Sequence, residues 1–385
     1  MRTASTYETA FATYLGPDVE AFAFWKGRVA LYAILAAMGI GEGDEVILSG
    51  YTCVVVPNAI RCAGATPIYV DIRPGEYNVD VETARQAITE KTKAIIVQHS
   101  YGIPADTAAF VALGRETGIA IVEDCAHAFG STRDGVHVGL LADASFFSSQ
   151  WTKPYTTGLG GMAITRDPEL AAKLAAVQGE FARPSPKRLS RLKVQYALYQ
   201  RFFSPRLYWF ARRMLNALSG AGLFVGSVGQ DEMEGKIPDD FRWRMSEFQE
   251  KVGSKKLAEA IAGLPYRREL ASIYDRRLAE AGWPTCGLAE GTVLLRYPVC
   301  VANKDALLEA AKSKQIELGS WFETPLHPLP LEQHHYFGYE LGRCPVTEAT
   351  AREAVNLPVH GRVSKADADR ILEFFLQNAQ RLAKA

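Results

Sequence analysis

The first half of the chain alternates between short apolar runs and longer segments whose apolar residues have helical spacing. Strands are expected at 44–48, 67–71, 93–98 and 119–124, and helices at 30–38, 81–88 and 105–117. The strands are apolar at successive positions, which is typical of strands buried on both faces. Because helical segments separate them, the pattern predicts a mostly parallel sheet covered by helices, in an α/β domain.

The second half has a different order of elements. A helix-like stretch with two interruptions is expected at 245–278, then a strand at 293–301 and helices at 304–314 and 365–382. This order is typical of a smaller α+β domain. We therefore expect a large domain over residues 1–240 and a small C-terminal domain over residues 241–385.

Between these parts, residues 184–238 form an atypical insertion. Residues 188–225 are basic, aromatic and leucine-rich, with Pro205 in the middle and a glycine-rich stretch at 220–229. The pattern predicts two amphipathic helical pieces. Two interpretations remain open: the insertion forms a wall of a dimer interface or active site, or it contacts a membrane surface peripherally.

Composition narrows the class of protein. The 385 residues are 48% hydrophobic, and 43 basic residues equal 43 acidic ones, so nothing indicates a nucleic-acid partner. The six cysteines have neither CxxC nor zinc spacing, which indicates reduced thiols and no metal site. We find no signal peptide and no apolar stretch long enough to span a membrane, so a soluble cytoplasmic protein is expected.

Three features carry candidate chemistry. Asp124 ends an apolar strand, where ligands of parallel sheets gather, although it could simply cap the next turn. Lys153 lies between a strand end and the glycines Gly160 and Gly161, although a single loop lysine is usually solvated. Gly27 opens an apolar helix, whose N-terminus suits an anion.

Many ordered segments resemble the DegT/StrS family of sugar aminotransferases, which belong to the aspartate aminotransferase-like superfamily (fold type I) and use pyridoxal phosphate. They are Lys26-Gly27-Arg28-Val29-Ala30-Leu31, residues 41–47, 64–71, 99–102, 122–130 and 147–153, Gly160-Gly161, Arg244-Met245-Ser246, Pro325-Leu326-His327, residues 344–348 and Leu357-Pro358. The resemblance covers nearly the whole chain except about 184–238. It implies a large cofactor domain with a mostly parallel seven-stranded sheet.

The resemblance assigns roles to the candidate residues. It implies that Lys153 forms the Schiff base with the cofactor, and that Asp124 contacts the pyridine nitrogen and keeps it protonated. Ser148, with the pair Gly27 and Arg28, would bind the phosphate, although the family has threonine where this chain has Arg28.

Other positions depart further from the family. His127 stands where the family usually has glutamine near the cofactor's 3-hydroxyl group, and alone it would more often be a core histidine. Cys53 stands where an aromatic residue usually stacks on the cofactor ring, so either Cys53 packs there or Tyr51 turns in. His327, in the Pro-Leu-His element, is a candidate substrate contact together with Tyr51.

The implied activity is transfer of an amino group to a keto-sugar, most simply a nucleotide-linked one, in amino-sugar and polysaccharide biosynthesis. Glutamate would be the amino donor, and the cofactor would alternate with its pyridoxamine phosphate form. A homodimer with shared active sites is implied. The alternatives are an aminotransferase acting on a cyclitol or other non-nucleotide ketone, a pyridoxal phosphate-dependent lyase or dehydratase, and a non-catalytic regulator. Family dehydratases replace the lysine by histidine, so Lys153 favours transamination.

Overall fold

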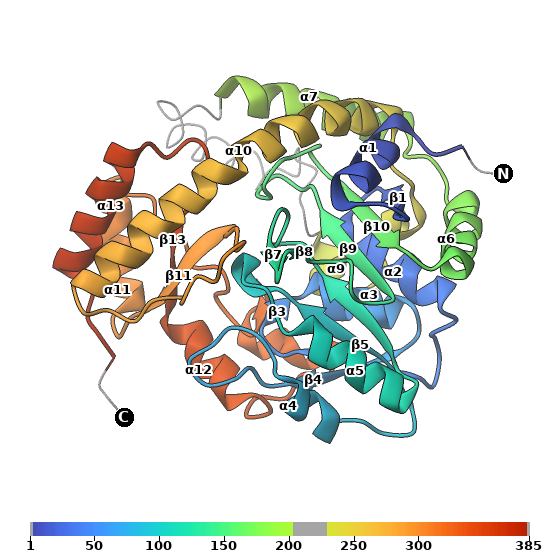
Figure 1. The fold of residues 1–385 in the computed structure, drawn as a ribbon, viewed down its shortest axis with the longest axis horizontal. Coiled ribbons are helices and arrows are strands. Elements are labelled where there is room, and N and C mark those ends of the chain that lie inside the picture. Colours follow the sequence, from blue (N-terminus) through green and yellow to red (C-terminus); the bar gives the residue numbers. More distant parts are fainter. Residues whose placement is uncertain (1–2, 203–228, 383–385) are drawn as a thin grey trace.

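The computed structural model describes residues 3–202 and 229–382, and its largest element is a seven-stranded sheet (Figure 1). In spatial order the strands are β1 (Glu20–Phe24), β10 (Gly161–Thr165), β9 (Ala144–Ser148), β6 (Ala120–Asp124), β5 (Thr92–Gln98), β2 (Glu45–Ser49) and β4 (Thr66–Val70). Only β10 runs antiparallel to its two neighbours. The mostly parallel seven-stranded sheet is thus confirmed.

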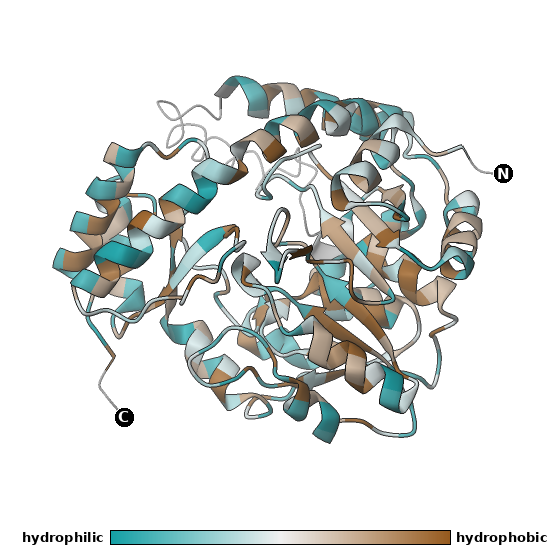
Figure 2. Ribbon diagram, in the orientation of Figure 1, coloured by the Kyte–Doolittle hydropathy of each residue, from teal (hydrophilic) through white to brown (hydrophobic). Residues whose placement is uncertain are grey.

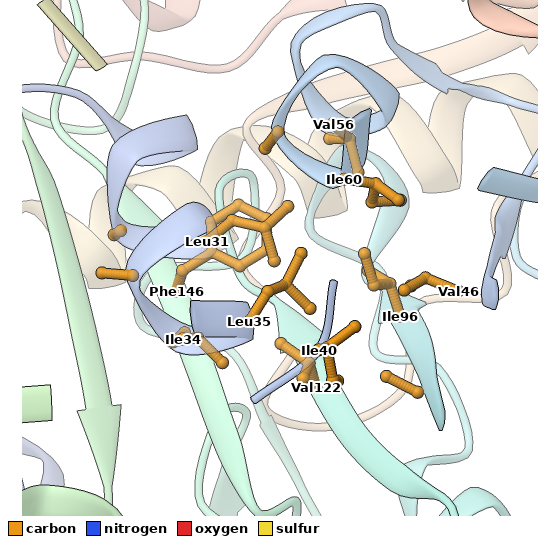
Figure 3. Packing of buried hydrophobic residues seen from close by; sticks show 14 of the residues in the cluster. Leu31, Ile34, Leu35, Ile40, Val46, Val56, Ile60, Ile96, Val122 and Phe146 are labelled. Carbon is orange, nitrogen blue, oxygen red and sulfur yellow. The ribbon is translucent and has the colours of Figure 1, made fainter. Parts of the chain in front are cut away.

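Helices bury both faces of this sheet. Val46 and Leu48 of β2 point into one hydrophobic core, whereas Ile47 between them belongs to the opposite one, as expected from the alternation of side chains along a strand. On the first face, Leu31, Ile34 and Leu35 pack close to sheet residues such as Val122 and Phe146 (Figure 3). Burial on both faces explains the continuous apolar runs in the sequence.

Three helices of this part of the chain follow the expected positions 30–38, 81–88 and 105–117, and three others were not predicted. The first face carries α2 (Gly27–Ala37), α3 (Val55–Cys62) and α6 (Pro168–Glu180), the other face carries α4 (Val81–Gln86) and α5 (Thr107–Thr117), and α1 (Thr6–Leu15) packs beside β1. Short elements complete the region: β3 (Thr52–Cys53), η1 (Ser100–Gly102), β7 (Thr132–Arg133) and β8 (Val136–His137).

One long helix, α10 (Glu247–Glu280), joins the two parts of the molecule. The two interruptions expected at 245–278 are wrong, because the helix is continuous even at Pro265. A proline removes one backbone hydrogen bond, but packing on both sides offsets this loss. Leu257 packs in the large domain and Tyr274 packs in the small one.

The C-terminal part forms a second core around a two-stranded sheet. It contains β11 (Arg296–Cys300), α11 (Lys304–Ser313), α12 (Pro345–Glu353), β13 (Ala354–Pro358) and α13 (Lys365–Asn378). The segment with β12 (Leu326–His327) and η3 (Leu331–Phe337) returns to the large core, where Leu326, Leu329 and Phe337 are buried. The domain boundary at 240 stays a prediction, since α10 contributes to both cores.

Hydrophobic residues concentrate on the central strands and polar ones on the outer helices (Figure 2).

The insertion begins with α7 (Pro186–Phe202), a helix next to α10 (Figure 1). The first expected amphipathic piece is therefore a helix, and the second lies outside the described residues. After the gap come α9 (Gln230–Met233) and η2 (Asp239–Arg242). Among the described helices, none combines the length and the hydrophobicity needed to cross a membrane.

Candidate active site

The carboxyl ends of three neighbouring strands bring candidate residues to one edge of the sheet. Gln98 at the end of β5 pairs with Asp124 at the end of β6, and Asp124 pairs with Phe146 in β9, two residues before Ser148. Lys153 lies in the loop that follows β9. This edge is where ligands bind in parallel sheets.

A cavity opens at this edge, between the sheet, the start of α2 and the segment around β12. Its walls are formed by Gly27, Arg28, Cys53, Val55, Val56, Gln98, His99, Asp124, Ala126, His127, Phe146, Ser148, Gln150, Lys153, Trp321, Phe322, His327 and Pro328. Every cofactor-binding residue expected from the sequence is among them, and so is His327.

Lys153 has the electrostatic environment of a reactive amine. Burial lowers the pKa of its ammonium group to about 8, because the charged form loses hydration. Cys53 and Asp124 oppose this shift, whereas the positive charges of Arg296 and Arg28 add to it. A larger share of Lys153 is therefore neutral and nucleophilic near pH 7 than of an ordinary lysine.

Asp124 is 5% exposed at the end of β6. Its Oδ1 accepts a hydrogen bond of 2.9 Å from the backbone N–H of Ala126, so it does cap the following turn. Burial nevertheless raises the pKa of the carboxyl group, and the nearby Lys153 only partly offsets this. A carboxylate in such surroundings is stabilised by a further cation in the cavity.

The start of α2 and the end of β9 lie against each other. A β-carbon added to Gly27 would come within 3.1 Å of the Ser148 β-carbon, and one added to Gly161 would come within 2.3 Å of the Lys26 carbonyl oxygen. Glycine is therefore required at position 161, whereas a side chain at position 27 would crowd Ser148. Because the first N–H groups of a helix have no partner within it, the helix start beside the Ser148 hydroxyl offers hydrogen-bond donors that suit an anion.

Four charged residues surround this helix start in a buried cluster. Arg28 forms an ion pair with Glu232, and Lys26 Nζ lies 2.9 Å from Asp240 and 3.7 Å from Glu232. Trp25 donates a hydrogen bond of 3.1 Å to Asp240. The basic residues of the helix start are thus balanced by two acidic residues, Glu232 near the end of the insertion and Asp240 just after it.

The structure distinguishes between Cys53 and Tyr51. Cys53 lines the cavity, whereas the Tyr51 ring is fully buried behind the wall, 4.7 Å from the Phe322 ring. The Tyr51 hydroxyl lies 2.6 Å from that of Tyr101, which holds the backbone of Trp321 and Phe322 by hydrogen bonds. Tyr51 does not turn into the cavity, so its expected stacking and its substrate contact receive no support here.

An aromatic wall faces the lysine from the C-terminal part of the chain. Lys153 Nζ lies 5.5 Å from the centre of the Trp321 ring, which itself lies 4.3 Å from the His327 ring. Burial lowers the pKa of His327 to about 3 and that of His127 well below its usual value, so both are neutral. Their Nδ1 atoms accept backbone hydrogen bonds, which leaves each proton on Nε2.

A second network of buried polar residues is centred on His99, which also lines the cavity. His99 accepts a hydrogen bond of 2.9 Å from Ala105 through Nδ1, and its Nε2 lies 2.9 Å from Glu123, to which Thr107 also donates. His99, Glu123 and Cys125 lie close enough to hold a metal ion. Because hydrogen bonds already engage the histidine and the carboxylate, we interpret this cluster as structural.

The loop of Lys153 is held in place by α7. The Trp151 ring lies 5.1 Å from that of Tyr199, whose hydroxyl donates to the Trp151 carbonyl at 3.1 Å. Arg362 Nη1 lies 3.4 Å from the same hydroxyl. Leu192 is buried with Trp25 and packs against this region. The insertion therefore packs behind the loop that carries Lys153, but none of its described residues lines the cavity.

Sequence patterns did not identify Trp321, Phe322, Glu232 or Asp240. The first two precede the Pro325-Leu326-His327 element by a few residues, which was the only available signal. The acidic pair lies in a segment without periodicity or motif.

Comparisons with known proteins found relatives over nearly the whole chain. GDP-perosamine synthase of Caulobacter vibrioides is 30% identical over 95% of this chain and 87% of its own. L-glutamine:2-deoxy-scyllo-inosose aminotransferase of Streptomyces lividus is 31% identical over 81% of this chain and 67% of its own. The crystal structure of DesV from S. venezuelae superposes with a TM-score of 0.75 at 25% identity, covering 98% of this chain and 89% of that one.

The family model matches residues 2–191 and 218–376, so it leaves out the middle of the insertion. The protein belongs to the DegT/DnrJ/EryC1/StrS aminotransferase family, whose members are pyridoxal phosphate-dependent aminotransferases.

Proposed function

We propose that this protein transfers an amino group from glutamate to a nucleotide-linked keto-sugar, with pyridoxal phosphate bound through Lys153. The observation that carries the proposal is the pairing of Lys153 and Asp124 in one buried cavity beside the start of α2. A lysine, a buried carboxylate and an anion site are the three groups that this cofactor requires.

The residues present fit the cofactor. Lys153 would hold its aldehyde carbon, Asp124 its ring nitrogen, and Gly27 with Ser148 its phosphate. When bound, the cofactor supplies a conjugated ring that accepts the electrons released as a proton leaves the carbon next to nitrogen. The raised pKa of Asp124 supports this fit, because a protonated ring nitrogen is the cation that such a buried carboxylate lacks.

Lys153 performs the proton transfer in this proposal. With the cofactor and a substrate bound, Nζ of Lys153 would take a proton from the substrate and return it. A pKa of about 8 suits a group that must act both as base and as acid near neutral pH.

The neutral histidines orient the reacting groups. His127 carries its proton on Nε2 and would donate it to the ring oxygen that glutamine contacts in the family. His327 would donate in the same way to a hydroxyl group of the sugar. Trp321 and Phe322 limit access of water from this side, which favours proton return to the substrate over exchange with solvent.

Two alternatives use the same site. The inosose aminotransferase among the relatives favours a cyclitol ketone as the second candidate substrate. A lyase that retains the lysine differs in the fate of the substrate and not in the cofactor site. We further propose that the protein acts as a homodimer, which sedimentation of the purified protein would test.

A panel of substrates tests the proposal. Holoenzyme is first treated with glutamate, and the visible absorption band of the lysine-bound cofactor should disappear as the cofactor takes the amino group. Nucleotide-linked keto-sugars and cyclitol ketones are then added one at a time, and products are identified by mass spectrometry. An aminated nucleotide sugar supports the proposal. An aminated cyclitol alone would select the second candidate, and a dehydrated or cleaved product would select the lyase.

A further inference from the structure

We propose that the outer face of α7 binds the surface of a membrane rich in anionic phospholipids. We define this face by five residues, Lys187, Arg191, Val194, Leu198 and Arg201. They are separated by four, three, four and three positions, which places them in one stripe along an α-helix. This inference concerns where the enzyme resides and does not depend on its substrate.

All charged residues of α7 are basic. Its 17 residues include Lys187, Arg188, Arg191, Lys193 and Arg201, and no acidic residue. The whole chain has equal numbers of basic and acidic residues, so this helix departs from the composition around it. Basic residues near an anionic bilayer are each attracted to its negative surface potential.

The inner and outer faces of the helix have different environments. Leu192 and Gln195 are buried, and Tyr196 and Tyr199 pack against Trp151, so the inner face is already used. On the outer face Val194 is 62% exposed and Leu198 36% exposed.

The outer face therefore combines two exposed apolar side chains with three basic ones. Two aliphatic side chains bury too little apolar area for tight membrane binding alone. Together with basic neighbours they form the polar-and-apolar pattern of a helix that lies in the membrane interface.

Part of the outer face of α7 lies outside the region that the family model matches, which favours a role other than the reaction that family members share. The family model stops at residue 191 and resumes at 218, so Val194, Leu198 and Arg201 lie outside what members share. A second copy of the chain, docked by this face on itself, would bring three basic residues against three others. A nucleic acid would use the basic residues and would not require Val194 and Leu198.

Co-sedimentation with vesicles tests the proposal directly. The full-length holoenzyme is mixed with vesicles of phosphatidylcholine alone, or of phosphatidylcholine with about a third phosphatidylglycerol, at low ionic strength. We expect pelleting with the anionic vesicles only, and release of the protein at high salt because screening weakens the attraction. Equal pelleting with both kinds of vesicle, or none with either, would overturn the proposal.

Matched variants locate the surface. The triple variant Lys187→Gln, Arg191→Gln, Arg201→Gln should weaken the partition to anionic vesicles by tenfold or more. The control triple variant Arg276→Gln, Lys312→Gln, Arg370→Gln removes the same charge from exposed positions of the small domain and should leave it unchanged.

A second variant separates the remaining outcomes. Val194→Ser, Leu198→Ser keeps every charge and should still weaken vesicle binding several-fold. If the control and the test triple variants lost vesicle binding equally, the net charge of the protein and not the outer face of α7 would cause the binding. If the face variants instead changed the sedimentation coefficient and left vesicle binding intact, α7 would contact a second copy. The cofactor absorption band serves as the measure of folding throughout.

Discussion

Arg28 and Glu232 form a buried ion pair although 204 residues separate them in the chain. Both side chains are 1% exposed, and Arg28 also lines the cavity. Arg28 places a guanidinium group at the start of α2, where the resemblance predicts a neutral threonine beside the cofactor phosphate. Glu232 balances that charge from the last part of the insertion.

Substitution Glu232→Gln should destabilise the protein by about 3 kcal/mol, because it leaves a buried guanidinium without its counter-charge. Unfolding in denaturant, followed by fluorescence, measures the loss. Glu234→Gln is the matched control, since Glu234 is partly exposed and pairs with Lys236 at the surface. The double variant Arg28→Thr, Glu232→Gln should recover part of the stability. A cost below about 1 kcal/mol for Glu232→Gln would contradict the importance of the pair.

Loading of the apoprotein with pyridoxal phosphate should depend on pH through the Lys153 amine. Only the neutral amine attacks the aldehyde, and burial lowers its pKa to about 8. The rate constant for appearance of the absorption band should therefore rise with pH and level off above about 8. A continued rise toward pH 10, as for a free lysine, would mean that Lys153 is not the attacking group.

Lys153→Ala should abolish the lysine-bound absorption band while the protein still binds the cofactor without a covalent bond. Spectra after borohydride treatment and gel filtration check this, because only a covalent linkage survives reduction on the chain. Persistence of a reducible linkage in the variant would assign it to another lysine. Lys173→Ala, at an exposed position on α6, is the control.

Asp124→Asn should lower the rate of the glutamate half-reaction on the order of 10²-fold or more, because the ring loses its electrostatic stabilisation. The rate of disappearance of the absorption band in a stopped-flow instrument measures this step alone. The linkage to Lys153 should still form. A change below about threefold would remove Asp124 from the proposed role.

Tyr199→Phe should loosen the lysine loop without removing the ring that packs on Trp151. The lost hydrogen bond to the Trp151 carbonyl is worth about 1 kcal/mol. Faster hydrogen exchange at residues 150–157 is the expected result, measured by mass spectrometry. Tyr196→Phe is the matched control, because the Tyr196 hydroxyl accepts a hydrogen bond from Gln200 and has no hydrogen bond to the lysine loop among the described residues. Equal exchange in both variants would show that α7 does not restrain the loop.

The sequence pattern by itself determined four of the seven strands and the edge of the sheet where the site lies. Strands buried on both faces are apolar at consecutive positions, so β2, β4, β5 and β6 were visible in the pattern. Asp124 and Ser148 end neighbouring strands, which fixes their proximity once the strands are parallel. The resemblance to a family added Lys153, whose role could not be inferred from a single loop lysine.

Only the tertiary structure decided which distant residues complete the site. Trp321 faces Lys153, Glu232 balances Arg28, and Tyr51 lies behind the wall that Cys53 lines. It also decided that α10 continues through Pro265, because packing on two cores offsets the local cost. The spacing of apolar residues along the chain indicates whether a residue is buried, but it does not indicate which residues that residue contacts. Contacts between positions far apart in the chain depend on how its elements pack, and the folded structure alone specifies them.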